Sequence, residues 1–294
     1  MIATQARASA ELAPLPPPGE LALTPREFER IRKLVYQQCG IRLSDQKRDL
    51  VFNRVARRLR ALALKSFTAY CDLAENDASG REIEELINAI TTNVTSFFRE
   101  SHHFDFLTDQ LLPRIAARRD ARHRLRAWCA GCSSGEEPYS LAITLAESRL
   151  FERGWDVKIL ATDIDTQILS RASAGVYRRD KMDGLSSELE KRWFERSGAP
   201  GEDLRQARPE IRNLVTFRRL NLMGPWPMKG PFDFIFCRNV AIYFDRPTQE
   251  RLFRRYWELL DPDHGHLLVG HSESLATMQD IFRPCGNTIY RKQC

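Results

Sequence analysis

Residues 128–139 read WCAGCSSGEEPY and join a short apolar run at 125–130 to a helical pattern at 136–150. The turn between them consists of small residues and includes Gly131 and Gly135. Small residues let a ligand approach the backbone, and the start of a helix offers N–H groups without an intrahelical partner. The stretch predicts a strand, a turn and a helix that bind a nucleotide-type ligand. The alternative is a tight turn in which glycine serves only the backbone geometry.

The kind of protein is limited by the length of the chain, by its composition and by its cysteine count. The chain has 294 residues, of which 43% are hydrophobic and 29% are charged, which predicts a globular protein with two domains. No apolar run approaches the roughly 18 residues that a membrane helix needs, and the N-terminus lacks a secretory pattern. Seven cysteines without regular spacing favour reduced thiols. We therefore expect a cytoplasmic protein without membrane insertion, and as a separate expectation we take it to be a monomer.

The first 90 residues predict a tail and a small helical domain. Residues 1–20 are rich in alanine and proline, which predicts a disordered tail. Residues 21–90 contain apolar residues at helical spacing, and a capping box at 24–27 begins the first helix. The pattern predicts an all-helical domain without obvious chemistry of its own.

A basic segment lies within this helical domain. Residues 42–65 contain eight basic and two acidic side chains, so their net charge equals the +6 of the whole chain. The helix predicted there has one apolar stripe, and Arg54, Arg57 and Arg58 fall on its other side. These arginines are candidates for contact with an acidic partner, and the alternative is a solvated face.

After residue 120 the pattern changes to an alternation of strands and helices. Residues 91–100 predict a linker, and 101–294 predict an α/β domain that has a parallel sheet with helices on both faces. The expected strands are 125–130, 157–162, 214–220, 232–237 and 266–269, followed by an extended segment at 282–292. The segment at about 177–213 is too long for an empty connection, so we expect an inserted small subdomain there.

Polar residues follow two expected strands at the sheet edge that carries the opening turn. Asp163 ends the second strand, where a carboxylate can accept hydrogen bonds from both ribose hydroxyls. Asp165 fits the N-cap of the next helix better. Arg238 and Asn239 end a later buried strand. Because the carboxyl ends of parallel strands share one edge, we expect these side chains to line a ligand crevice.

The cysteine and histidine pairs are weak candidates for a metal site. Cys129 and Cys132 have the spacing of a redox pair or of half a zinc site, but no second pair lies at zinc-finger spacing and Cys129 is expected to point into the sheet. His102 and His103, like the pair at 264–266, lack helical i, i+4 spacing and are not expected to meet an acidic partner. We therefore expect no metal site, and we interpret these histidines as solvated turn residues.

Five stretches of the sequence resemble the CheR family, the chemotaxis receptor glutamate O-methyltransferases that use S-adenosylmethionine. They occur in the family's order, at residues 93–100, 135–140, 161–165, 236–244 and 270–274. The resemblance implies an α/β fold class, with a class I (Rossmann-like) methyltransferase domain that contains an inserted small β-subdomain at 177–213. It also implies that a small all-helical domain precedes this methyltransferase domain.

The resemblance further implies a cofactor site at the sheet edge. Its lining would consist of Asn93, Thr95, Arg99, Gly131, Glu136, Asp163, Asn221, Leu222, Arg238 and Asn239. Asp163 would hold the ribose, Glu136 would lie near the methionine part, and the linker at 91–100 would close over the cofactor. The hypotheses for catalytic residues are Arg99, which would hold a carboxylate, and Tyr243, which would position the acceptor oxygen. The alternative for Arg99 is a surface salt bridge, and the alternative for Tyr243 is a half-buried packing ring.

The implied reaction is methyl transfer from S-adenosylmethionine to glutamate side chains of methyl-accepting chemotaxis receptors. The products would be glutamyl methyl esters and S-adenosylhomocysteine. A glutamate is ionised at pH 7 and is already a nucleophile, so no general base is required. The receptors are helical bundles that bear glutamates, which would suit Arg54, Arg57 and Arg58. In this family the β-subdomain can also bind a peptide at the receptor C-terminus.

Other functions stay open from the residues alone. The positive net charge is compatible with a nucleic-acid methyltransferase of the same fold. However, no nucleic-acid-binding motif occurs, and we expect no nucleic-acid partner. A non-catalytic signalling scaffold that binds the cofactor would share the fold, although all five stretches are intact. A small-molecule methyltransferase would not need the basic helical domain.

Overall fold

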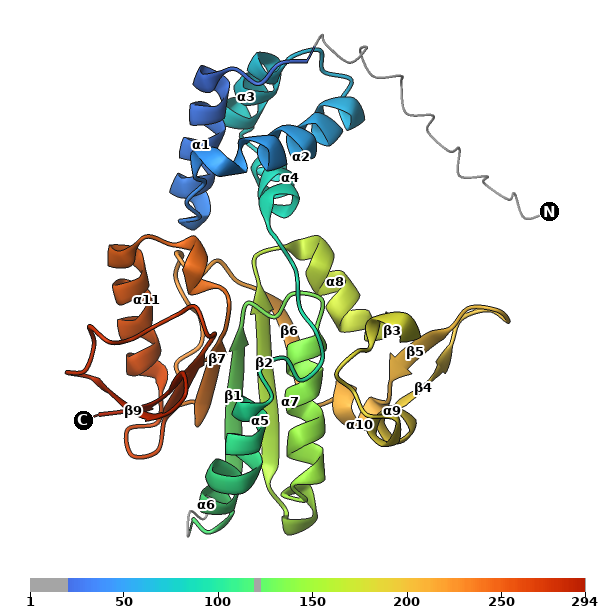
Figure 1. Ribbon diagram of the computed structural model, residues 1–294, viewed down its shortest axis with the longest axis vertical. Coiled ribbons are helices and arrows are strands. Elements are labelled where there is room, and N and C mark those ends of the chain that lie inside the picture. Colours follow the sequence, from blue (N-terminus) through green and yellow to red (C-terminus); the bar gives the residue numbers. More distant parts are fainter. Residues whose placement is uncertain (1–20, 119–122, 294) are drawn as a thin grey trace. The chain divides into compact units, whose positions relative to one another are not determined.

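The chain forms two compact units that divide between Thr91 and Thr92 (Figure 1). The computed structural model describes residues 21–118 and 123–293, so the tail predicted at 1–20 lies outside the described residues. Within these ranges, no helix combines the length and the apolar character that a membrane span requires.

The first unit consists of helices packed around a small apolar core. Its elements are α1 Pro25–Cys39, the 3₁₀ helix η1 Asp45–Lys47, α2 Arg48–Ala61, α3 Phe67–Asn76 and α4 Arg81–Ile90. The predicted capping box begins α1: the Thr24 hydroxyl accepts the Glu27 N–H at 3.3 Å, and the Glu27 carboxylate accepts the Thr24 N–H at 2.8 Å. The apolar stripe of α2 is buried, as its spacing predicts, and comprises Val51, Val55 and Leu59.

The second unit is built around a seven-stranded sheet in the order β6-β2-β1-β7-β8-β10-β9. The strands are β1 Arg124–Ala130, β2 Asp156–Asp163, β6 Val215–Arg219, β7 Phe234–Cys237, β8 His266–Val269, β9 Phe282–Gly286 and β10 Ile289–Lys292. The first five strands in the order pair in parallel, and β10 is antiparallel to both neighbours. The expected extended segment at 282–292 is therefore a hairpin, because the chain reverses at Thr288, where φ is 56°.

The register of the parallel strands brings their carboxyl ends to one edge. Ala130 of β1 pairs with Thr162 of β2, and Phe236 of β7 pairs with both Cys129 and Leu268. The loops that leave these strands therefore meet at one edge, which is where open α/β sheets bind their ligands.

Helices cover both faces of the large sheet, which confirms the predicted fold class. They are α5 His102–Phe106, the π-helical η2 Leu107–Leu111, α6 Leu112–Ala116, α7 Glu136–Glu147, the 3₁₀ helix η3 Phe151–Arg153, α8 Thr166–Ala174 and α11 Arg246–Leu259. Apolar residues of α5, η2, α6 and α7 share one core with Ala127 and Cys129. Trp128 points to the opposite face, where its ring meets Tyr256 of α11 edge-on at 5.1 Å.

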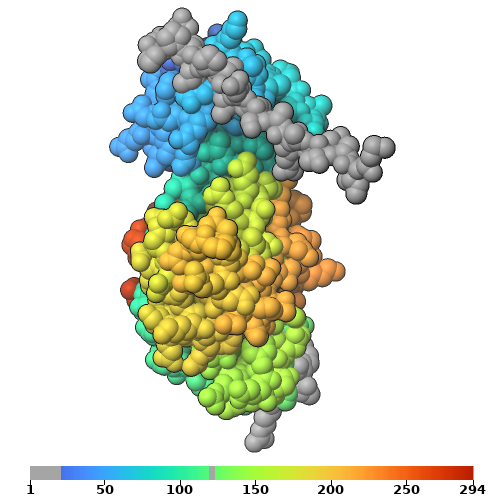
Figure 2. All heavy atoms as spheres, turned by 90° about the vertical axis from the view of Figure 1, so that its right-hand side faces the viewer, coloured from blue at the N-terminus to red at the C-terminus, as the bar shows by residue number. Residues whose placement is uncertain are grey.

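A second, three-stranded sheet is inserted between α8 and β6. Its strands are antiparallel in the order β3-β5-β4. The elements are β3 Val176–Arg178, the 3₁₀ helix η4 Arg179–Lys181, α9 Ser187–Trp193, β4 Phe194–Ser197, β5 Leu204–Ala207 and α10 Pro209–Arg212. This insertion is the β-subdomain of the predicted fold class, and Figure 2 shows its atoms, in yellow, on one face of the second unit.

Candidate functional site

The turn between β1 and α7 requires glycine at two positions. Gly131 and Gly135 both have φ of 100°, which residues with a Cβ rarely adopt. A Cβ on Gly131 would collide with a methyl carbon of Val240, and a Cβ on Gly135 would lie 2.6 Å from Oη of Tyr177. Close approach of the loop after β7 and of the β-subdomain therefore explains these glycines as much as the backbone conformation does.

Two aspartates at the end of β2 have different surroundings. The Asp163 carboxylate accepts the N–H groups of Ser133 at 2.8 Å and Asp165 at 3.1 Å, and burial raises its pKa. A carboxylate offers about four acceptor positions, so Asp163 can accept further hydrogen bonds from a ligand. Asp165 accepts the N–H groups of Gln167 and Ile168, both at 3.0 Å, which confirms its predicted role as the N-cap of α8.

The linker is bound to the second unit at several points. The Asn93 amide donates to the Asp165 carboxylate at 2.8 Å, and the Asn93 carbonyl accepts the Ser133 hydroxyl at 3.0 Å. Farther along, the Phe98 N–H donates to the Ser140 hydroxyl at 2.9 Å. The linker therefore runs beside the turn between β1 and α7 and along the start of α7.

Aromatic packing fixes the middle of the linker. The buried Phe97 ring meets the rings of Tyr177 and Phe194 edge-on, with centroids 5.1 and 5.6 Å apart. Phe98 and Glu100 have φ of 50° and 55°. Such conformations are uncommon for residues with a Cβ and persist where tertiary contacts hold them.

Thr95 and Arg99 lie on this linker and are half-buried. The Arg99 guanidinium donates to the carbonyl of Val94 at 3.0 Å. A guanidinium has five N–H donors, so this contact orients the side chain and leaves donors for another group. That Thr95 and Arg99 contact a ligand stays a prediction.

Glu136 is the first residue of α7, and only 8% of its surface is exposed. Its carboxylate accepts the Ser134 hydroxyl at 2.6 Å, and burial raises its pKa. A cationic ligand group beside it would favour the ionised form and lower that pKa again. Glu136 is thus suited to a positively charged part of a ligand.

The Arg238 side chain is buried inside the protein, with 1% of it exposed. It pairs with Glu137 at 2.9 Å and with Glu100 at 3.5 Å, and it donates to the carbonyl of Arg99. Burial raises the pKa of Glu137, and the charge of Arg238 opposes that rise. Arg238 lies at the expected edge, but its guanidinium joins β7, α7 and the linker, so it positions Arg99 through the backbone.

One buried carboxylate organises the loop after β7. Glu273 accepts the N–H groups of Asn239, Val240, Ala241 and Gly270 at 2.9, 2.9, 2.6 and 2.5 Å. Burial raises the pKa of Glu273, and these N–H groups oppose that rise. Asn239 has φ of 57°, which asparagine tolerates better than most residues. Sequence reasoning missed this role, although Glu273 lies within the fifth family-like stretch.

The segment after β6 begins beside Asp163. The Leu220 N–H donates to the Asp163 carbonyl at 2.9 Å. The Asn221 side chain then accepts the Met223 N–H at 3.0 Å, and Leu222 is buried. The structure therefore brings Asn221 and Leu222 close to the aspartate that was predicted to share their ligand.

Tyr243 ends the short 3₁₀ helix η5 Ala241–Tyr243 and is half-buried. Its N–H donates to the Val240 carbonyl at 3.2 Å. It lies two residues after Ala241, the last residue whose N–H Glu273 accepts, so the same carboxylate helps to position the Tyr243 backbone. A contact of its hydroxyl with a substrate stays a prediction.

The arginines predicted to contact a substrate differ in their surroundings within the first unit. Arg54 donates to backbone carbonyls at the end of α4, at 2.5 to 3.1 Å. Arg58 pairs with the buried Glu82 at 2.6 Å and with Glu85 at 3.3 Å. Arg57 is exposed. Arg54 and Arg58 thus stabilise their own unit, and Arg57 is left as the candidate for contact with a partner.

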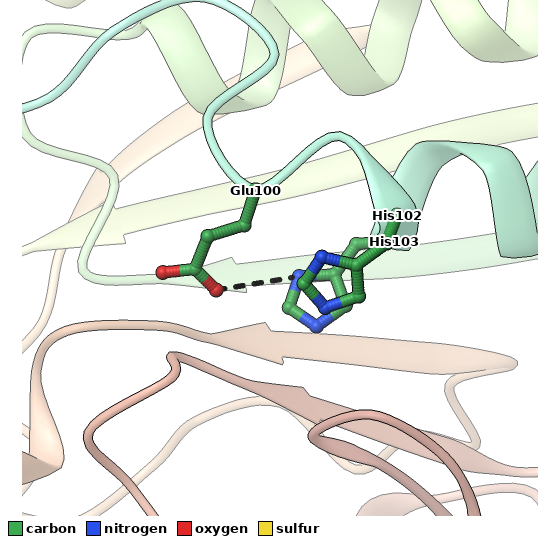
Figure 3. A group of neighbouring side chains, drawn as sticks. All are labelled: Glu100, His102 and His103. Carbon is green, nitrogen blue, oxygen red and sulfur yellow. Dashed lines mark ion pairs between the residues drawn. The ribbon is translucent and has the colours of Figure 1, made fainter.

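Figure 3 shows Glu100, His102 and His103, whose ligand atoms lie within 4.8 Å of one another. His103 is fully buried 3.8 Å from the Glu100 carboxylate, and burial lowers its pKa to about 3. Two expectations are wrong here: Glu100 is an acidic neighbour of His102 and His103, and His103 and His266 are buried instead of solvated. Arg238 lies 3.5 Å from the same carboxylate and would repel a divalent cation, so we assign no metal to this cluster.

The Cys129 and Cys132 side chains are buried free thiols. Cys129 donates to the Glu137 carboxylate at 2.9 Å, and burial raises the pKa of both thiols. Protonated, buried thiols are poor nucleophiles. Their spacing therefore reflects a strand end and a tight turn, as predicted.

The fold is that of a class I, S-adenosylmethionine-dependent methyltransferase. Residues 93–291 match the model of the CheR methyltransferase, SAM binding domain, and residues 26–91 match the CheR methyltransferase, all-alpha domain. The chain belongs to the CheR methyltransferase family.

Named relatives share most of the chain. The chemotaxis protein methyltransferase of Escherichia coli (strain K12) is 45% identical over 272 residues, which cover 92% of either chain. That of Salmonella typhimurium is 46% identical over 92% of this chain and 91% of its own. Chemotaxis protein methyltransferase 2 of Pseudomonas aeruginosa is 42% identical over 92% of this chain and 94% of its own. The similarity thus extends over both units.

Proposed function

We propose that the protein transfers the methyl group of S-adenosylmethionine to glutamate side chains of chemotaxis receptors, giving glutamyl methyl esters. The observation that carries the proposal is the carboxyl edge of the sheet, where Asp163, Glu136 and the glycine turn lie beside the linker. Relatives named as chemotaxis protein methyltransferases support receptors as the substrate class. We further propose that the protein acts as a cytoplasmic monomer.

The residues at this edge fit S-adenosylmethionine. Asp163 retains acceptor capacity for both ribose hydroxyls, and Glu136 can accept hydrogen bonds from the ammonium group of the methionine part. Gly131 leaves space where a side chain would obstruct the turn. The remaining lining would come from Asn93, Thr95, Arg99, Asn221, Leu222, Arg238 and Asn239.

Alignment is the main catalytic task of the chain. When bound, the cofactor supplies a methyl group on a sulfonium cation. An unshifted glutamate has a pKa of about 4.3, so the acceptor is already ionised and the protein need not remove a proton. Arg99 would hold the acceptor carboxylate and Tyr243 would orient its attacking oxygen, because geometry sets the rate of such a step.

Receptor contacts would come from two further surfaces. Arg57 is an exposed cation on α2, which suits the acidic surface of a glutamate-bearing helical bundle. In the β-subdomain, β4 is an edge strand, and an extended peptide from a receptor C-terminus could pair with it.

A labelling experiment tests the reaction. Tritiated S-adenosylmethionine is incubated with the protein and with Escherichia coli membranes that contain chemotaxis receptors but no methyltransferase of their own. We expect label on the receptor band that alkali releases as volatile methanol. Asp163→Ala should abolish labelling, and Asp183→Ala, at an exposed position, should not. Alkali-stable label, or label on added nucleic acid, would contradict a carboxylate acceptor.

The role of Arg99 has its own test. Arg99→Ala should lower the labelling rate about 100-fold, because misplaced reactants lose that much. It should also weaken binding of S-adenosylhomocysteine if the guanidinium holds the cofactor carboxylate. A variant with the wild-type rate and affinity would show that Arg99 is a surface residue.

A further inference from the structure

Arg255 of α11 reaches the segment that follows β6. Its guanidinium donates to the Leu222 carbonyl at 2.6 Å and to the Gly224 carbonyl at 2.7 Å. The same group lies 3.7 Å from the centroid of the Trp226 ring. A planar guanidinium can bind two carbonyls with its edge and a ring with its face, whereas a lysine ammonium is a single point charge.

Trp226 fixes the far end of this segment to the second unit. Its indole N–H donates to the Leu222 carbonyl at 3.3 Å. Its ring meets Trp128 of β1 edge-on at 4.9 Å and stacks with Tyr256 of α11 at 5.2 Å. The segment at 221–226 is thus a turn whose two ends are joined by the Trp226–Leu222 hydrogen bond. Arg255 binds two carbonyls within this turn.

The near end of the segment is fixed at the proposed cofactor site. The Leu220 N–H donates to the Asp163 carbonyl at 2.9 Å, and Asn221 and Leu222 follow directly. Arg255 is half-buried, and this partial burial lowers its pKa, so the carbonyls of the segment replace part of the water around its charge. Ordinary packing of a surface helix does not require that arrangement.

We propose that Arg255 is a positioning residue for S-adenosylmethionine, which holds the turn at 221–226 so that Asn221 and Leu222 border the cofactor beside Asp163. The inference rests on the proposed function, because it assumes that the cofactor occupies this edge of the sheet. Arg255 acts through the backbone of the turn and does not touch the reacting atoms.

The test is calorimetric binding of S-adenosylhomocysteine to the full chain. Arg255→Lys keeps the charge and loses the simultaneous contact with both carbonyls, so we expect about tenfold weaker binding, the size of one charged hydrogen bond. Trp226→Phe, which loses the indole donor and part of the ring face, should weaken binding about threefold. Arg254→Lys is the matched control, because Arg254 lies one residue away and is paired only loosely with Asp280 at 3.4 Å.

Steady-state kinetics separate positioning from general damage. Arg255→Lys should raise KM for S-adenosylmethionine about tenfold and leave kcat and the melting temperature unchanged. A wild-type affinity in Arg255→Lys, an equal loss in Arg254→Lys, or a fall in kcat at constant KM would overturn the inference alone. A wild-type protein that does not bind S-adenosylhomocysteine would overturn the proposed function as well.

Discussion

The basic helix α2 and the carboxyl edge of the large sheet both concentrate charged residues, but they use them differently. On α2, Arg54 and Arg58 bind carbonyls and carboxylates of their own unit, and Arg57 is exposed. At the sheet edge, Arg238 and Glu273 are buried and hold backbone segments that carry other candidate residues. The charges of Arg54 and Arg58 are therefore structural, whereas Arg238 and Glu273 arrange the loops of the proposed cofactor site.

The difference follows from geometry. Parallel strands end at the same edge, so a polar residue just after a strand must lie near the others. On a helix, neighbouring positions are turned by about 100°, so arginines one to four residues apart can face solvent or another helix. Sequence pattern therefore locates a sheet edge better than it separates free arginines from bound ones.

The largest effect is expected at the sheet edge, from Glu273→Gln. The substitution places an amide where a carboxylate now accepts the N–H groups of Asn239, Val240 and Ala241. Leaving buried N–H groups without an acceptor costs about 1 to 3 kcal/mol for each group, and we expect the loop that leads to Tyr243 to lose its conformation. Methyl transfer should fall at least about 100-fold, since catalysis depends on alignment.

Glu250→Gln is the control for this experiment. Glu250 pairs with Arg246 at 3.6 Å on the solvent-facing side of α11, and such pairs contribute about 0 to 1 kcal/mol. Its activity and melting temperature should stay at wild-type values. If Glu273→Gln also kept full activity, the buried charge at the sheet edge would not be needed to arrange the loops there. The edge would then not differ from α2 in this respect.

The next largest effect is expected in the first unit, from Arg58→Ala. Glu82 is buried, with 7% exposed, and would lose its partner, which destabilises by about 2 to 3 kcal/mol for a pair with one partly exposed member. Hydrogen exchange of the α4 amides in the full chain measures this loss without assuming that both units unfold together. Arg57→Ala should leave that exchange unchanged, and equal protection in both variants would contradict the structural role of Arg58.

Much of the architecture follows from the sequence, because local patterns determine it. The alternation of apolar patterns predicts the sheet with covered faces, and the capping motifs predict the starts of α1 and α8 at Thr24 and Asp165. What the patterns miss depends on residues distant in sequence: Glu273 binds a loop 34 residues away, and Arg58 binds Glu82 24 residues away. The burial of His103 likewise comes from tertiary packing, which spacing alone does not encode.

An effect of similar size is expected in acid, from His266 at the opposite end of the sheet from the proposed site. Burial lowers the pKa of His266 to about 4 from an ordinary 6.5. The unfolded chain therefore binds a proton more readily than the folded one. The stability that this neutral histidine contributes is complete above pH 6.5 and is lost as the pH falls towards 4, by up to about 1.4 kcal/mol per pH unit.

Thermal unfolding between pH 7.5 and pH 4.5 measures this contribution. His266→Gln should reduce the acid-induced fall in melting temperature, and His264→Gln, at an exposed position, should leave it unchanged. Comparing the two variants cancels the opposing carboxylates, whose raised pKa values favour the folded state in acid. Parallel curves for both variants would show that His266 does not titrate on unfolding.

The smallest effect is expected from Arg57→Glu, which tests whether any part of the basic helix serves a partner. Reversing all three arginines would confound docking with folding, because Arg54 and Arg58 bind their own unit. The single reversal at exposed Arg57 should raise KM for receptor membranes about fivefold, a loss of about 1 kcal/mol for a surface charge. The shift should shrink as salt is added, since exposed charges are screened beyond about 10 Å at 0.1 M.

Arg153→Glu supplies the matched control, because Arg153 is an exposed arginine on η3 of the second unit and undergoes the same change of charge. Affinity for S-adenosylhomocysteine should stay at the wild-type value in both variants. An equal rise of KM in both would mean that receptors respond to the overall charge of the protein. A rise of KM confined to Arg57→Glu would instead localise the receptor contact to α2. Of the three arginines, Arg57 would then bind a partner, whereas Arg54 and Arg58 stabilise their own unit.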